Sequence, residues 1–156
     1  MELLTVIAII AVLAGLLFPA LTAARRAAKE GKAKVQINQL ATAFRSYYNE
    51  YALWPTNGSI TSTAIWLGIL QGTDTTNNPR KIVFMEFKSS ESSYNGVAGI
   101  YDPWNQNYNL GFDTNYDNTI DIPSSASLPS GASTNTSFLI WSTGDPKKPN
   151  TIGSWK

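Results

Sequence analysis

The chain has 156 residues, of which 43% are hydrophobic and 15% charged, and it contains neither histidine nor cysteine. The length allows one modest domain with an appendage. Without histidine, the usual acid and base at neutral pH and the commonest metal ligand are missing. Without cysteine, disulfides, thiolate nucleophiles and zinc–thiolate sites are excluded. The formal net charge of +1 argues against binding of nucleic acid by overall charge.

The charges are distributed unevenly along the chain. Residues 1–24 carry one charged side chain, Glu2, whereas residues 25–50 carry six cations and two anions. The remainder carries six cations and eight anions. We therefore divide the chain into an apolar segment at 1–24, a basic amphipathic segment at 25–53 and a polar head at 54–156.

The apolar segment has the length of a membrane span. From Leu3 to Ala24 no side chain is charged, and a helix over these residues is about 33 Å long, against roughly 30 Å for a bilayer core. Gly15 and Pro19 interrupt the run, but helices in membranes and tight bundles tolerate such kinks. A cleaved signal peptide is the alternative. It is disfavoured because no basic residues precede the run and no turn-rich cleavage region follows it.

Beyond Arg25 the pattern becomes that of an amphipathic helix. Apolar residues recur at spacings of three and four, at Val35 or Ile37, Leu40, Ala41, Phe44, Tyr47, Tyr48 and Tyr51. Because the residue before a proline avoids the α region, we expect this helix to end before Trp54-Pro55. The sequence thus predicts one helix of about 50 residues, roughly 75 Å long. Its first half would face lipid or like helices, and its second half would pack under the head.

The head is rich in Ser, Thr, Asn and Gly, with clusters of aromatic and β-branched residues. These clusters predict a short helix at Ser62–Leu70, strands at Lys81–Phe87 and Phe138–Trp141, and weaker strands at Gly99–Tyr101 and Tyr108–Phe112. The expected fold class is α+β, with the long N-terminal helix packed on a small antiparallel sheet.

The run Glu2–Ala14, ELLTVIAIIAVLA, resembles the N-terminal cleavage and methylation signature of the type IV pilin and pseudopilin superfamily. The resemblance implies that Glu2 meets the N-terminal amine of a neighbouring subunit during assembly, and that Pro19 kinks the helix. The alternative for Glu2 is a carboxylate that favours the helix dipole.

Members of this superfamily carry a basic leader that a prepilin peptidase removes. The resemblance therefore leads us to expect a leader upstream of Met1 and a head on the periplasmic side of a bacterial inner membrane, crossed once. The cluster at 25–34, taken alone under the positive-inside rule, would hold the head in the cytoplasm instead.

Four motifs in the head extend the resemblance to the major pseudopilin of type II secretion systems. They are YNEYALWPT at 48–56, DPWNQNY at 102–108, IWSTGD at 140–145 and IGSW at 152–155. We expect Asp102 to start a turn, Pro103 to fix it and Trp104 to pack against the helix. Tyr108 and Trp155 complete the set of structural residues in these motifs.

Two loops are candidate calcium sites. The resemblance implies calcium in the loop before IGSW, which keeps Asp145 but also holds Lys147 and Lys148, a poor calcium cage. The second candidate has oxygen-bearing side chains at alternate positions, like the opening of an EF-hand loop: Asp113, Asn115, Asp117, Thr119 and Asp121. It lacks the glycine at the sixth position and the glutamate at the twelfth. A polar turn between strands is the alternative for this segment.

The resemblance implies a structural subunit of a type II secretion pseudopilus. Such a subunit is stored in the inner membrane and assembles by helix packing into a homo-oligomeric filament, with other pseudopilins and an inner-membrane assembly platform as partners. A type IV pilin for adhesion, motility or DNA uptake is the alternative within the superfamily. From another class, the alternative is a membrane-anchored periplasmic binding domain that uses the aromatic-rich head.

The sequence does not favour an enzyme or a nucleic-acid-binding protein. The carboxylates are scattered, the serines have no histidine partner, and the lysines that a Ser–Lys dyad would need lie in no recognised motif. The basic residues at 25–34 fit a charged belt at a membrane surface or inside a filament better than a nucleic-acid contact.

Overall fold

The computed structural model describes residues 2–55, 61, 64–120 and 135–155. The elements in chain order are α1 (Glu2–Tyr51), α2 (Ala64–Gln71), α3 (Ser89–Ser92), β1 (Ser93–Tyr94), β2 (Val97–Ala98), β3 (Asn109–Phe112), β4 (Phe138–Asp145) and β5 (Lys148–Gly153). Strands β3, β4 and β5 form an antiparallel sheet in that order, and β1 pairs with β2 in a separate hairpin. The predicted α+β class is confirmed.

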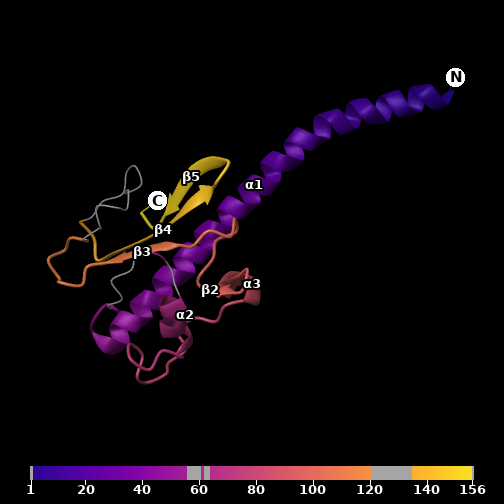
Figure 1. Ribbon diagram of the computed structural model, residues 1–156. Helices are drawn as coiled ribbons and strands as arrows, with labels where there is room; N and C mark the ends of the chain where they lie inside the picture. Colours follow the sequence, from indigo (N-terminus) through magenta and orange to yellow (C-terminus); the bar gives the residue numbers. More distant parts are fainter. Residues whose placement is uncertain (1, 56–60, 62–63, 121–134, 156) are drawn as a thin grey trace.

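Helix α1 runs the length of the molecule (Figure 1). The sheet and α2 contact its second half, and its first half projects beyond the head (Figure 1). The helix ends at Tyr51, because Ala52 adopts the left-handed conformation (φ 55°) while its N–H still donates to the carbonyl of Tyr48 at 2.7 Å. The end therefore falls before Trp54-Pro55, as the sequence predicts.

The core lies between the second half of α1 and the elements of the head. The buried face of α1 consists of Ala33, Ile37, Leu40, Ala41, Ala43, Phe44 and Tyr47. Phe44 is central, since its ring centroid lies 5.8 Å from that of Trp66 in α2 and 4.8 Å from that of Phe112 in β3. Val35, the alternative to Ile37 in the predicted stripe, is 56% exposed. The amphipathic prediction is confirmed, with Ile37 as its inward member.

The predicted strand at Lys81–Phe87 is wrong. The segment has no regular secondary structure and pairs with no strand among the described residues, and its first residue, Lys81, has a left-handed φ of 54°. Its backbone N–H groups find other acceptors: Phe84 and Met85 both donate to the carbonyl of Leu70, at 2.9 and 3.2 Å. The end of α2 thus satisfies donors that a neighbouring strand would otherwise take.

The weak strand predicted at Gly99–Tyr101 is also wrong. The chain there leaves the β1–β2 hairpin, which turns at Asn95 and Gly96 with φ of 50° and 76°. An Asn-Gly pair is the commonest signal for such a tight turn. Strand β2 ends at Ala98, and Tyr101 makes only an isolated antiparallel bridge, with Asn107. By contrast, strands at 108–112 and 138–141 are confirmed as β3 and β4, and the short helix predicted at Ser62–Leu70 is found as α2.

Candidate functional site

The apolar half of α1, Leu3–Ala24, is the largest exposed apolar surface of the described structure. Leu3, Leu4 and Phe18 are 75%, 71% and 68% exposed, and no other described helix is both long and apolar enough to span a membrane. Glu2 is the first residue of the helix. A helix that is apolar all round requires lipid or other protein around it. This half of α1 is therefore long and apolar enough to span a membrane.

Helix α1 is continuous through Gly15 and Pro19. Pro19 has no N–H, so the carbonyl of Gly15, four residues earlier, loses its helical donor. The hydroxyl of Thr22 donates to the carbonyl of Pro19 at 2.8 Å. No atom lies within 4 Å of where a Cβ on Gly15 would stand. The helix curves along this exposed half (Figure 1), where a proline weakens the hydrogen-bond ladder.

The tip of the β4–β5 hairpin meets α1 just beyond the apolar half. Arg26 donates to Glu30 at 3.0 Å and to the carbonyl of Lys148 at 3.3 Å. Asp145, opposite Lys148 in the hairpin, accepts the backbone N–H of Lys147 at 2.9 Å. Basic residues from distant parts of the sequence therefore lie together next to the apolar half.

Asp102 connects the DPW loop to β4. It is 3% exposed; one of its oxygens accepts the N–H groups of Trp104 and Gln106 at 2.9 and 2.8 Å, and the other accepts the hydroxyl of Ser142. Ser142, fully buried, accepts the N–H of Gly144 at 2.9 Å. Burial raises the pKa of Asp102 above its usual value, although these hydrogen bonds act in the opposite direction.

Trp104 and Tyr108 tie the same loop to α1. Trp104 is half-buried against the main core, and the Lys29 ammonium lies 6.0 Å from its ring centroid. The hydroxyl of Tyr108 donates to the side-chain oxygen of Gln36 at 2.8 Å, and both side chains are buried. Desolvation by burial raises the pKa of Tyr108. The DPWNQNY segment thus joins helix and sheet, a structural role.

Trp155 packs against a second, smaller core of Ile120, Leu139 and Trp141. Its ring covers Gly153 so closely that a Cβ there would overlap it. Its indole nitrogen is buried and has no hydrogen-bond partner among the described residues. Glycine at 153 is therefore required by the close approach of this ring.

The two candidate calcium loops lie at opposite ends of the head. Asp113 lines a cavity with Arg45 and Tyr48 of α1, whereas Asp145 lines a surface pocket with Arg26 and Glu30. Arg26 and Arg45 are separated by roughly 28 Å along the helix. The structure brings Asp113, Asn115 and Asp117 together in one loop and leaves Asp145 far away. Asp121 lies outside the described residues.

The loop at Asp145 does not suit calcium. It offers one carboxylate, and two cations, Lys147 and Lys148, stand beside it. Calcium takes six to eight oxygen ligands, usually including several carboxylates. We therefore assign no metal to this hairpin.

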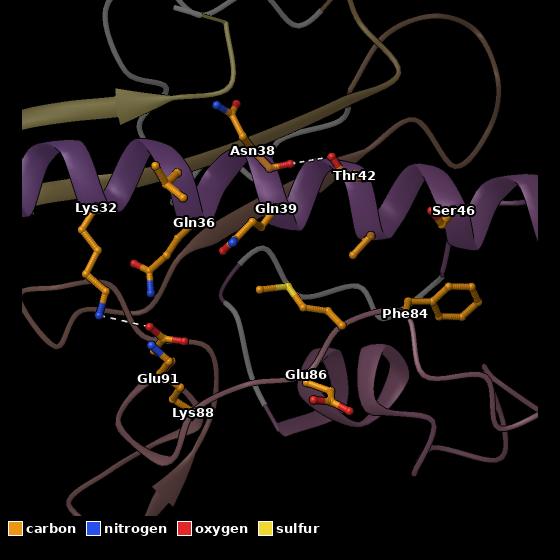
Figure 2. A pocket seen from close by; sticks show the side chains of 13 residues that line it. Lys32, Gln36, Asn38, Gln39, Thr42, Ser46, Phe84, Glu86, Lys88 and Glu91 are labelled. Carbon is orange, nitrogen blue, oxygen red and sulfur yellow. Dashed lines mark hydrogen bonds and ion pairs between the residues drawn. The ribbon is translucent and has the colours of Figure 1, made fainter.

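A groove of about 690 Å³ runs between α1 and residues 84–91 (Figure 2). Lys32 on α1 forms an ion pair with Glu91 across it at 3.0 Å. Phe84 is its one aromatic lining residue among those described. All five tryptophans are buried or half-buried elsewhere, so Phe84 is the one described aromatic side chain that this groove offers to a ligand.

No protein-family model, curated protein or solved structure matches the chain. The described residues contain no group of three or more histidine, cysteine or acidic side chains that could hold a metal. The long apolar helix on a small antiparallel sheet is compatible with a pilin-like architecture.

Sequence reasoning missed Gln36 and Ser142, the partners of Tyr108 and Asp102. Gln36 lies next to Ile37, at the edge of the predicted buried stripe. Its position there is the one sequence feature that could have indicated that its polar side chain is buried. Ser142 lies within the predicted strand motif, but nothing in its spacing from Asp102 indicates the contact. Long-range pairs of this kind emerge only when the chain is folded.

Proposed function

We propose that this protein is a filament subunit of the pseudopilin type, anchored by the apolar half of α1 in a membrane before assembly. Assembly would exchange lipid around that half for the same half of neighbouring copies. Such a subunit acts by assembling with its neighbours, and its head would form the outer surface of the filament.

The observation that carries the proposal is the contrast between the two halves of one continuous helix. The second half is buried under the head, whereas Leu3, Leu4 and the other large side chains described in the first half are exposed. Outside a membrane, such helices can bury this apolar surface by packing against one another. The order of the motifs at 2–14, 48–56, 102–108, 140–145 and 152–155 further supports this type of subunit.

Within the superfamily we favour a pseudopilus of a type II secretion system, driving protein export, over a pilus for adhesion, motility or DNA uptake. The DPW and IGSW motifs resemble those of the major pseudopilin. The absence of cysteine also fits, because many adhesion pilins close their C-terminal loop with a disulfide. Glu2 would meet the N-terminal amine of the next subunit, with the head on the periplasmic side of the inner membrane.

The absence of cysteine also makes the proposal directly testable. Leu4 and Leu13 are nine residues apart and so lie on opposite faces of α1, and both are exposed. We expect a Leu4→Cys/Leu13→Cys variant, oxidised in membranes of the expressing cells, to give a ladder of cross-linked multimers. Glu2→Gln in this background should shorten the ladder.

The matched control is Glu50→Gln, which changes a carboxylate at the other end of the same helix, paired with Arg80 in the head. It should leave the ladder unchanged. If the double-cysteine variant forms no cross-linked multimers on oxidation and stays monomeric, filament packing is contradicted. Specific binding of a glycan or peptide by that monomer would then favour the membrane-anchored binding domain.

A further inference from the structure

The carboxylate of Asp113 is buried at the start of the loop 113–119, directly after β3. Asp113 is 3% exposed; its Oδ2 accepts the N–H of Asn118 at 2.9 Å, so the carboxylate faces into the loop. Its Oδ1 is buried and has no hydrogen-bond partner among the described residues. A buried carboxylate oxygen without a hydrogen-bond partner is costly, and a bound cation is one group that can satisfy it.

No protein cation in the described structure fills this role. The three described ion pairs do not include Asp113. Arg45 lines the same cavity of about 370 Å³, but its guanidinium carbon lies 5.0 Å from the ring centroid of Phe138. Among the described residues, no ion pair therefore neutralises Asp113.

Two residues of the loop, Tyr116 and Asn118, adopt the left-handed conformation, with φ of 61° and 65°. In an EF-hand loop the sixth position is glycine because the chain turns sharply there. The sixth residue here is Asn118, which adopts the left-handed conformation with φ 65°, and asparagine tolerates this conformation. The missing glycine thus does not prevent the turn.

The other oxygen-bearing side chains of the loop are exposed and held near its backbone. Asp117 accepts the N–H of Thr119 at 2.7 Å, and Asn115 accepts the N–H of Asp117 at 3.4 Å. The side-chain amide of Asn115 donates to Asp117 at 3.1 Å. Asn115 and Asp117 therefore already lie close to each other, on the same short loop as the buried Asp113.

We propose that the loop 113–119 binds calcium, with side-chain oxygens of Asp113, Asn115 and Asp117 and the backbone carbonyl of Thr119 as ligands. Hard oxygen donors without nitrogen or sulfur exclude a zinc-type site. A mixture of carboxylate, amide and carbonyl oxygens on a flexible loop suits calcium better than magnesium, which requires near-ideal octahedral geometry. Two carboxylates place the dissociation constant in the weak class of extracellular modules, on the order of 10⁻⁴–10⁻³ M.

Calcium in this loop would also order the region where α1 ends. Tyr116 lies within the loop, and its hydroxyl accepts the backbone N–H of Trp54 at 3.1 Å. Trp54 in turn packs on Tyr48 of α1, with ring centroids 4.6 Å apart. A metal that fixes the loop therefore fixes the contact between the loop and the chain leaving α1.

The test uses the full chain in calcium-free detergent solution and terbium, a luminescent substitute for calcium, as the probe. Tyr116 in the loop can sensitise terbium bound there. We expect terbium emission that calcium at millimolar concentration displaces and equimolar magnesium does not. Wild-type protein that binds neither terbium nor calcium at these concentrations would overturn the proposal.

Three variants identify the loop. Asp113→Asn and Asp117→Asn should each weaken calcium binding at least about tenfold, since even outer-shell partners of a bound metal have effects of that size. Asp145→Asn, in the other acidic loop, should bind like the wild type. If Asp113→Asn fails to fold, the exposed Asp117 decides the question. Unchanged affinity in Asp117→Asn, or loss confined to Asp145→Asn, would overturn the assignment.

This inference does not rest on the proposed function. Calcium binding is measured on the solubilised chain, whereas filament packing is measured by cross-linking in membranes. Calcium binding without a cross-linked ladder would refute the filament proposal alone, and a ladder without calcium binding would refute the calcium site alone.

Discussion

Ser142 in β4 donates its hydroxyl hydrogen to Asp102, forty residues earlier in the chain, and both side chains are buried. The same hydroxyl oxygen accepts the N–H of Gly144, at the irregularity where β4 and β5 shift register. One side chain thus connects the DPW loop to the point where the sheet is distorted. The loop in turn contacts α1 through Trp104, so this contact links helix, loop and sheet.

Ser142→Ala should destabilise the head by about 1–3 kcal/mol, the usual cost of leaving buried polar groups without a partner. Both an oxygen of Asp102 and the N–H of Gly144 lose their partner. The free energy of unfolding is measured by urea denaturation of the full chain in mild detergent. Ser46→Ala, on the exposed face of α1, is the control and should change it by less than about 0.5 kcal/mol. Equal effects of the two variants would contradict the role of Ser142.

The raised pKa of Asp102 predicts a pH dependence of stability. Because burial raises its pKa in the folded state, the folded protein holds this proton more tightly than the unfolded chain does. The contribution of Asp102 is therefore fully present below its ordinary pKa of about 3.9, and it is lost as pH rises through the raised value. The free energy of unfolding of the wild type, relative to Asp102→Asn, should accordingly fall as pH rises.

Asp74 provides the control of opposite sign for this measurement. Hydrogen bonds from Asn77 and Thr76 lower its pKa. Its stabilisation is therefore present above its ordinary pKa and is lost as pH falls through the lowered value. The free energy of unfolding of the wild type, relative to Asp74→Asn, should therefore fall as the pH is lowered. A relative stability that is independent of pH for Asp102→Asn would show that its burial does not perturb the carboxyl.

Tyr108→Phe should destabilise the protein by about 1–3 kcal/mol, because the buried oxygen of Gln36 loses its donor. A double-mutant cycle with Gln36→Ala separates this contact from other effects of each change. Tyr94→Phe, at a 41% exposed tyrosine, should have little effect on the free energy of unfolding. Additive effects of Tyr108→Phe and Gln36→Ala would contradict a direct interaction between the two side chains.

The parts of the fold that depend on local pattern are predictable from the sequence, and those that depend on distant partners are not. The 3.6-residue period of α1 and the proline after Trp54 define the long helix and its end. Residues 81–87 have the composition of a strand, but the end of α2 takes their hydrogen bonds, a tertiary effect that composition does not report.

The same distinction holds for the candidate metal loop. The alternation of oxygen-bearing residues from Asp113 onward is visible in the sequence and suggests a calcium loop. Two further observations require coordinates: the left-handed conformation of Asn118 and the buried, unpartnered oxygen of Asp113. Sequence alone therefore favours a polar turn, and the buried, unpartnered oxygen of Asp113 is the observation that supports the calcium proposal.

Gly153→Ala should destabilise the protein by about 1–3 kcal/mol, the range for overpacking in a core. The added methyl group would overlap the ring of Trp155, and displacing that ring would open the small core around Trp141. Gly31→Ala is the control, because α1 leaves open space at Gly31 and alanine favours a helix by about 1 kcal/mol over glycine. Urea denaturation should thus show shifts of opposite sign. A stable Gly153→Ala protein with unchanged near-ultraviolet circular dichroism would show that Trp155 does not constrain this glycine.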